Sequence, residues 1–200
     1  MANLKRTRED ILKSVFDTVH SKGLTGTGLN ELFRVSGASS GSFYNYFRSK
    51  QELGHALIDF EWSQLKGNIL DLACRQGDNA HDRLLWIIDR LEAKQIESPE
   101  CSGCILGNFI VDLVEQDPSF RTHLQEIFDL WQKAIADIIR DGKAEFQPDV
   151  DPASLGEQIV TSLEGAMLMG RLYRNPEKIS RGFNLVRNIL DRAAEQAIEH

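Results

Sequence analysis

Cysteine is scarce in this chain of 200 residues, which has three, and an odd number of cysteines does not suit a disulfide framework. The sequence also lacks an apolar run as long as the roughly 18 residues that a membrane-spanning helix needs. No signal-peptide pattern follows Lys5, Arg6 and Arg8, because the next stretch is amphipathic rather than continuously apolar. These absences predict a protein that stays in the cytoplasm and does not enter a membrane.

Signatures of catalysis and of metal binding are missing as well. The chain contains no GxSxG motif, no Walker phosphate loop, no HExxH motif and no dinucleotide-binding glycine pattern. Its histidines are isolated in sequence, and Cys74 lies far from Cys101 and Cys104. We therefore expect neither an enzyme nor a bound metal or cofactor.

Helical spacing of apolar residues is present along nearly the whole chain, beginning with a stripe that includes Ile11, Val15 and Val19. No segment reads as a strand, and there is no repeat or low-complexity linker. Polar residues at 75–79 and the proline pairs at 117–118, 151–152 and 175–176 mark helix boundaries. We predict an all-α protein of about nine helices, the later ones over residues 49–74, 80–96, 104–115, 118–143, 152–174 and 178–197.

Residues 27–53 suggest two short helices around a glycine turn, followed by a third, longer helix. Thr27 is a candidate cap for the first short helix, and Ser36-Gly37 supplies the turn. The second helix carries small or hydrogen-bonding side chains suited to a DNA major groove, with Phe43 and Phe47 facing inward. These polar residues are Ser39, Ser40, Ser42, Tyr44 and Asn45. The run Ser49-Lys50-Gln51-Glu52 fits a capping box, whose helix N-terminus beside Lys50 can receive a phosphate.

This segment resembles the N-terminal domain of the TetR family of bacterial transcriptional regulators. The matching residues are Thr7-Arg8, Ile11-Leu12, Lys22-Gly23, Thr27, Gly37, Ser39, Gly41, Tyr44, Tyr46-Phe47, Ser49-Lys50 and Glu52-Leu53. Two positions depart from the family pattern, with Ser40 in place of a frequent basic residue and Phe33 in place of a frequent alanine. The resemblance implies a three-helix helix-turn-helix domain over residues 1–50 and a helical effector-binding and dimerisation domain over 51–200. It also implies that the helix at 39–47 reads an operator and that Thr27, Tyr44 and Lys50 hold phosphates.

The distribution of charge agrees with this division. The whole chain has a net charge of -7, but residues 1–50 hold eight basic against four acidic side chains, a net charge of +4. The remainder holds 15 basic and 26 acidic side chains, a net charge of -11. A basic end on an acidic body directs a polyanion to one part of the molecule.

A single short helix reads too few bases to find an operator, so we expect a homodimer on a palindromic sequence of double-stranded DNA. The helices at 152–174 and 178–197 are the predicted interface, because the first interleaves apolar residues with small ones. The small residues are Gly156, Gly165, Ala166 and Gly170. Periodicity alone leaves open that they pack within one chain. The family resemblance favours a four-helix bundle between two copies.

The run Cys101-Ser102-Gly103-Cys104 is the most unusual part of the body. A zinc site lacks further ligands, and a thioredoxin-like redox motif would need a preceding strand. Two interpretations stay open: Cys104 senses an oxidant or electrophile from a helix N-terminus, with Cys101 as a resolving partner, or both simply pack. The segment resembles one in a branch of TetR-like regulators, some responding to electrophiles and others to ordinary ligands.

An unknown small-molecule effector is expected to bind among the inward faces of the body helices. The candidate lining residues are Trp86, Phe109, Leu113, Phe128, Trp131 and Met167, with His123, Gln158 and Arg171 as polar neighbours. The sequence thus predicts a DNA-binding regulator, most simply a repressor released by an effector. The alternative is an all-helical protein-interaction adaptor, which would leave the basic, serine-rich segment unexplained.

Overall fold

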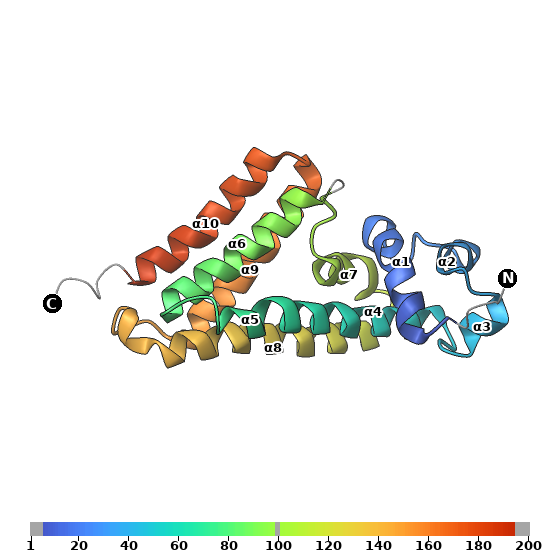
Figure 1. The fold of residues 1–200 in the computed structure, drawn as a ribbon, viewed down its shortest axis with the longest axis horizontal. Coiled ribbons are helices and arrows are strands. Elements are labelled where there is room, and N and C mark those ends of the chain that lie inside the picture. Colours follow the sequence, from blue (N-terminus) through green and yellow to red (C-terminus); the bar gives the residue numbers. More distant parts are fainter. Residues whose placement is uncertain (1–5, 99–100, 195–200) are drawn as a thin grey trace. The chain divides into compact units, whose positions relative to one another are not determined.

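The computed structural model describes residues 6–98 and 101–194, and within these ranges all regular structure is helical (Figure 1). The helices are α1 (Arg8–Lys22), α2 (Leu29–Ser36), α3 (Ser40–Tyr44), α4 (Lys50–Leu65), the π-helical η1 (Lys66–Leu70), α5 (Asp71–Ala73), α6 (Ala80–Glu97), α7 (Ile105–Leu113), α8 (Pro118–Asp141), the 3-10 turn η2 (Lys143–Glu145), α9 (Pro152–Tyr173) and α10 (Pro176–Ala194). Because α4, η1 and α5 follow one another without a break, the described ranges hold nine separate helices besides η2. This confirms the predicted all-α fold.

The polar and proline signals place most helix ends correctly. Asn79 caps α6 by accepting a hydrogen bond from the Asp82 backbone N at 2.8 Å, and Asp151 caps α9 through the Ser154 N at 2.9 Å. Three predicted ends were wrong by two residues: the last helix begins at Pro176 rather than 178, and α7 and α8 end at Leu113 and Asp141 rather than 115 and 143. The predicted end of the last helix, at 197, lies outside the described residues. Asn175 accepts from the Lys178 N at 3.0 Å, so Asn-Pro opens this helix as Asp-Pro opens α9.

The chain divides into two compact units. Unit 1 comprises Met1–Ser63 and Ile105–Leu124, and unit 2 comprises Gln64–Cys104 and Gln125–His200. The divisions fall inside α4, inside α8 and directly before α7. In the described part of the chain, no helix is both long and apolar enough to cross a membrane.

Unit 1 is built around α1–α4, with α7 and the first turns of α8 packed against them. Its fully buried side chains include Ile11, Leu32, Phe43, Phe47 and Leu53. At Gly54 of α4 an added Cβ would lie 2.6 Å from Leu24 and 2.8 Å from Phe120, so only a glycine allows this approach. The tight packing ties α4 to the start of α8 within unit 1.

A chain of polar contacts reinforces this junction. His123 Nε2 lies 2.9 Å from the Asp59 carboxylate, which can only accept, so this nitrogen carries the proton. His123 Nδ1 lies 2.9 Å from His55 Nδ1, and His55 Nε2 lies 3.0 Å from the Ser119 hydroxyl, so hydrogen bonds connect all four residues. The His55 ring also stacks on Phe120 with centroids 4.3 Å apart. These contacts join α4 to the start of α8.

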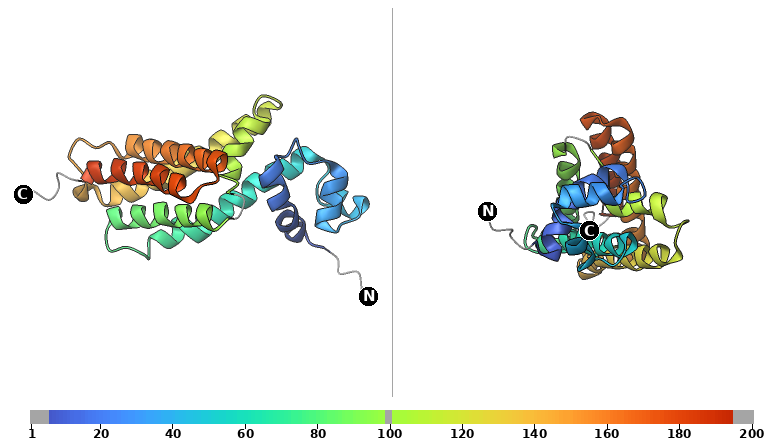
Figure 2. Two further views of the ribbon diagram at one scale, coloured as in Figure 1. Left: turned by 90° about the horizontal axis from the view of Figure 1, so that it is seen from above. Right: turned by 90° about the vertical axis from the view of Figure 1, so that its right-hand side faces the viewer.

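Unit 2 packs α10 against α9 and α6, and the three helices lie side by side in both figures (Figures 1 and 2). Small residues on α9 make the closest approaches. An added Cβ at Gly170 would lie 3.1 Å from Ile179 of α10, and one at Gly182 of α10 would lie 3.1 Å from Ala166. Gly156 similarly approaches α8, where its Cβ would lie 2.9 Å from the Gln132 carbonyl. Gly156, Ala166 and Gly170 thus serve contacts within the chain, whereas a Cβ at Gly165 would meet nothing within 4 Å.

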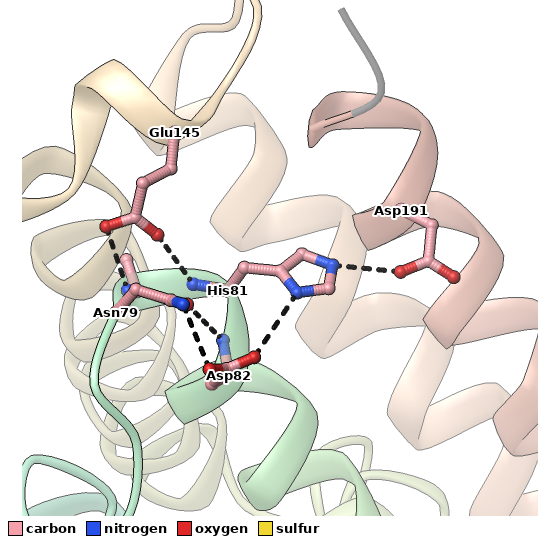
Figure 3. Close-up of polar contacts among 6 residues, drawn as sticks. Asn79, His81, Asp82, Glu145 and Asp191 are labelled. Carbon is pink, nitrogen blue, oxygen red and sulfur yellow. Dashed lines mark hydrogen bonds and ion pairs between the residues drawn. The ribbon is translucent and has the colours of Figure 1, made fainter. Parts of the chain in front are cut away.

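The start of α6 is fastened by a polar cluster in unit 2 (Figure 3). The Glu145 carboxylate accepts from the backbone N of Ala80 at 3.1 Å and from that of His81 at 3.0 Å. The His81 ring Nε2 lies 2.9 Å from Asp191 on α10. The Glu145 carboxylate thus satisfies two of the backbone amides that an α-helix leaves unpaired at its N-terminus. Hence α6 is tied to both η2 and α10.

Acid is expected to weaken unit 1 through His55. Burial and the neighbouring His123 lower the pKa of His55, while Asp117 and Asp59 oppose this shift only in part. The unfolded chain therefore takes up a proton before the folded chain does, and the free energy of unfolding decreases as pH falls below about 6.5. Thermal unfolding midpoints measured from pH 8 to pH 5.5 should fall less steeply in His55→Gln than in the wild type. The control is His20→Gln, outside the cluster. An identical slope for His55→Gln and wild type would contradict this assignment.

Candidate functional site

The turn between α2 and α3 has the geometry of a helix-turn-helix. Gly37 follows α2 in the left-handed conformation, with φ 64° and ψ 15°. Ser39 then caps α3 by accepting a hydrogen bond from the Ser42 N at 3.2 Å. A side chain at residue 37 would be strained in this conformation. The predicted glycine turn and the restart of a helix at Ser39 are both confirmed.

Helix α3 separates an apolar underside from a polar outer face. Phe43, and Phe47 just beyond the helix, are completely buried, with ring centroids 5.5 Å apart. On the outside, Ser39, Ser40 and Asn45 are exposed, and an added Cβ at Gly41 would meet nothing within 4 Å. Ser42 is half-buried, and Tyr44 is 43% exposed with its ring edge against Phe33. The structure thus brings the five predicted reading residues onto one short helix and its two flanking positions.

Thr27 and Lys50 occupy different environments from those residues. Thr27 is fully buried, and its hydroxyl donates to the Gly23 carbonyl at 2.7 Å. The prediction that Thr27 caps α2 was wrong, because Gly28 is the N-cap and supplies no side-chain hydrogen bond. Lys50 is half-buried in the first turn of α4, and its Nζ donates to the Thr25 carbonyl at 3.3 Å.

The capping box before α4 is present with one change of partner. The Glu52 N donates to the Ser49 hydroxyl at 3.0 Å, as predicted. The Glu52 carboxylate accepts from the Arg48 N at 2.8 Å, one residue earlier than in the predicted box. Two amides at the start of the helix are therefore satisfied, and the position of Lys50 is fixed by a well-defined helix N-terminus.

Two cations lie beside the turn, and the sequence analysis assigned neither of them a contact or a role. Arg6 lies at the turn, since its Nη2 would be 3.3 Å from a Cβ on Gly37, and the Arg8 guanidinium lies 5.2 Å from the centroid of the Phe47 ring. Both are exposed. The charge excess of residues 1–50 included them, but only the fold shows that they lie next to α3.

The cysteine segment has a strained and partly buried backbone. Cys101 has a φ of 41° and is 4% exposed, and its thiol donates to Gln95 Oε1 at 3.9 Å. Burial raises the pKa of the Cys101 thiol, against the opposing effects of Arg174 and the Gly103 amide. Cys104 is half-buried and directly precedes α7. The structure therefore places Cys104 at a helix start, as predicted, and keeps the Cys101 thiol protonated.

The predicted effector residues are divided between the two units. Phe109 and Leu113 of α7 belong to unit 1, and Trp86, Phe128, Trp131 and Met167 belong to unit 2. Trp131 stands out, because it is 1% exposed and its indole N–H is buried with no hydrogen-bond partner in the described part of the chain. Other residues line an open pocket of about 400 Å³ between α8 and α9, among them Lys133, Arg140 and Glu157.

Family models cover most of the chain. Residues 11–57 match the model described as "Bacterial regulatory proteins, tetR family", and residues 80–199 match "Tetracyclin repressor-like, C-terminal domain". The chain is 26% identical over 184 residues to the "HTH-type transcriptional repressor DhaR" of Mycobacterium sp., covering 90% of this chain and 89% of that protein.

Solved structures show the same fold. A TetR family regulator from Cytophaga hutchinsonii superposes with a TM-score of 0.82 at 24% identity, covering 94% of this chain and 95% of that one. The reduced form of E. coli NemR superposes with a TM-score of 0.79 at 22% identity, covering 90% of this chain and 95% of that one.

Two glycines beside α3 should respond oppositely to substitution by alanine. Gly37→Ala forces a side chain into the left-handed conformation and should lower the free energy of unfolding by about 1 kcal/mol. Gly41→Ala adds a methyl group in open space within a helix and should raise it by up to about 1 kcal/mol. Urea denaturation of both variants checks this, and equal effects would contradict the described turn geometry.

Proposed function

The chain belongs to the TetR family and is a DNA-binding transcriptional regulator, and we propose that it represses transcription as a homodimer on a palindromic operator. An effector, or modification of a thiol, releases the dimer from DNA. Residues 1–50 bind the DNA, and residues 51–200 bind the effector and the second copy. The protein works in the cytoplasm, where its DNA lies.

The outer face of α3 is the observation that carries the DNA-reading assignment. Asn45 has the amide that pairs well with an adenine edge, and the serine hydroxyls donate to or accept from any base. Gly41 leaves the backbone uncovered, which favours close approach to the groove. The buried Phe43 and Phe47 hold the helix rigidly beneath this face.

Phosphate contacts come from residues around α3. Lys50 has donors left beyond its bond to Thr25, and Tyr44, which is 43% exposed, carries a phenolic hydroxyl that can donate to a phosphate. Arg6 and Arg8 add positive charge beside the turn. Thr27 is buried, so its contribution is to hold the loop that leads into α2.

The dimer interface is proposed on the free face of α9. Leu168, Met169 and Leu172 are 50%, 46% and 67% exposed, which is costly for large apolar side chains on a lone surface. They continue the helical stripe through Gly165, which has open space around it, and Leu185 of α10 is 60% exposed. A second copy buries this stripe and sets two α3 helices about 34 to 36 Å apart, the spacing of successive major grooves.

Release from DNA requires an effector or a modification that favours the DNA-free state, by about 1 to 3 kcal/mol of coupling for an ordinary switch. Within unit 2, the unpaired indole N–H of Trp131 suits an effector that has a hydrogen-bond acceptor on an apolar body. Cys104 suits reaction with an oxidant or electrophile, with Cys101 as its partner, because a helix N-terminus favours thiolate. The related NemR was solved in a form called reduced.

Selection of bound sequences from a random duplex pool tests the proposal. The reduced protein at physiological salt should enrich a palindrome. Repeating the selection after mild oxidation tests the thiols, because loss of enrichment supports Cys104 as the sensor and unchanged enrichment supports an ordinary ligand. No enrichment in either state would sink the proposal and favour a protein-interaction adaptor.

Substitutions on α3 and α4 should separate phosphate contacts from base contacts. Lys50→Ala and Tyr44→Phe should weaken binding to all duplexes, and Lys50→Ala should reduce the salt slope of log K by about 1. Asn45→Ala should instead change the preferred sequence, at a cost of about 1 to 3 kcal/mol. Gly41→Ala should bind DNA more weakly although it stabilises α3. If all four variants bind like the wild type in titrations monitored by fluorescence anisotropy, α3 is not the reading helix.

A further inference from the structure

Helix α7 touches the turn between α1 and α2 through one carboxylate. Asp112 accepts a hydrogen bond from the Thr25 backbone N at 3.1 Å and another from the Thr25 hydroxyl. The same carboxylate would lie 3.0 Å from a Cβ on Gly23, which has a φ of 81°. All three residues belong to unit 1, where α7 lies beside α1 (Figure 1).

Thr25 joins this contact to the DNA-binding residues. Its amide and hydroxyl bind Asp112, and its carbonyl accepts from Lys50 Nζ at 3.3 Å. Two residues later, the buried Thr27 leads into α2. A shift of Thr25 would therefore move an acceptor of Lys50 and the entry to the helix-turn-helix together.

The charge of Asp112 is unfavourable for this neighbourhood on electrostatic grounds alone. A carboxylate near a surface that binds a polyanion repels phosphate, so its removal should strengthen DNA binding if charge were its only effect. A carboxylate that accepts two hydrogen bonds from one threonine restricts that threonine strongly, because bonds to an ionised acceptor exceed neutral ones in strength.

We propose that Asp112 is a positioning residue for DNA binding, which holds the Thr25 turn and, through it, Lys50. The inference rests on the proposed function, since it takes Lys50 to contact a phosphate. Asp112 itself does not touch DNA. The negative charge of Asp112 opposes DNA binding, whereas its hydrogen bonds to Thr25 favour it. Removal of Asp112 therefore weakens DNA binding if positioning is its role and strengthens binding if charge is its only effect.

The test compares Asp112→Ala, Thr25→Val and Thr25→Ser with a charge-matched control, Glu115→Gln. Glu115 lies two residues after the end of α7, and its carboxylate pairs with Arg121 rather than with the α1–α2 turn. The probes are the duplex selected above and a random-sequence duplex, both measured by fluorescence anisotropy over a range of salt concentrations.

Asp112→Ala and Thr25→Val should each weaken binding to both duplexes about tenfold, as expected for loss of a charged hydrogen bond. The double variant Asp112→Ala/Thr25→Val should bind no more weakly than either single variant, because both substitutions remove the same contact. Thr25→Ser keeps the hydroxyl and should bind within about twofold of the wild type. Glu115→Gln should bind equally or more tightly. The salt slope should fall by about 1 in Asp112→Ala, and Asp112→Ala should add nothing in a Lys50→Ala background.

Equal or tighter binding by Asp112→Ala would overturn the inference, as would additive losses in the double variant. Circular dichroism separates misfolding from mispositioning, since an Asp112→Ala variant that is folded at the temperature of the binding assay and binds DNA more weakly supports the proposal. If Asp112→Ala does not fold, the Thr25→Val and Thr25→Ser pair decides instead. A wild type that binds neither duplex would refute the proposed function, whereas a wild type that binds as well as Asp112→Ala refutes only the role of Asp112.

Discussion

A helix of five residues is too short to be stable by its own hydrogen bonds, and α3 depends on burial of the aromatic residues beneath it. Phe43 and Phe47 are completely inside unit 1, and Phe33 packs edge-on against Phe43 with centroids 5.2 Å apart. The left-handed Gly37 and the Ser39 cap set the direction in which this helix begins. Because the core packs against the side of α3 that carries Phe43, the opposite side stays exposed and is available to contact DNA.

The described contacts connect this helix to more distant parts of unit 1. Gly54 and the His55–His123 pair hold α4 to the start of α8, and Asp112 holds the α1–α2 turn to α7. These contacts join segments that are far apart in sequence, so the α1–α4 bundle does not stand alone. Residues 105–124 complete the same compact unit.

Much of the fold was predictable from local chemistry. Proline after a capping residue, glycine at a turn and a 3.6-residue apolar period act over a few residues, so α6, α8 and α9 and the reading helix were recognised. Asn175-Pro176 was correctly predicted to mark a boundary, but it was interpreted as the end of one helix, whereas Asn175 also caps the next. The prediction that Thr27 caps α2 failed because a threonine hydroxyl can either accept from a helix amide or donate to a carbonyl. In the structure it donates to the Gly23 carbonyl. The π-helical turn Lys66–Leu70 left no sequence signal that we recognised.

Contacts between segments that are distant in sequence could not be predicted from the sequence. Periodicity shows that Phe109 and Trp131 are buried, but not that they belong to different units. The glycines of α9 illustrate the same limit. Of the four small residues on which the predicted interface was based, Gly156, Ala166 and Gly170 face neighbours in the same chain, and Gly165 has open space.

The open space around Gly41 and the exposure of Ser39, Ser40 and Asn45 have an evolutionary consequence. Substitutions at exposed positions away from caps and packed contacts usually change folding stability little. At Ser40, Gly41 and Asn45, natural selection is therefore free to exchange side chains one at a time without first acquiring compensating mutations in the core. Duplicated copies of such a gene can diverge in the promoters they recognise while the scaffold beneath α3 stays the same.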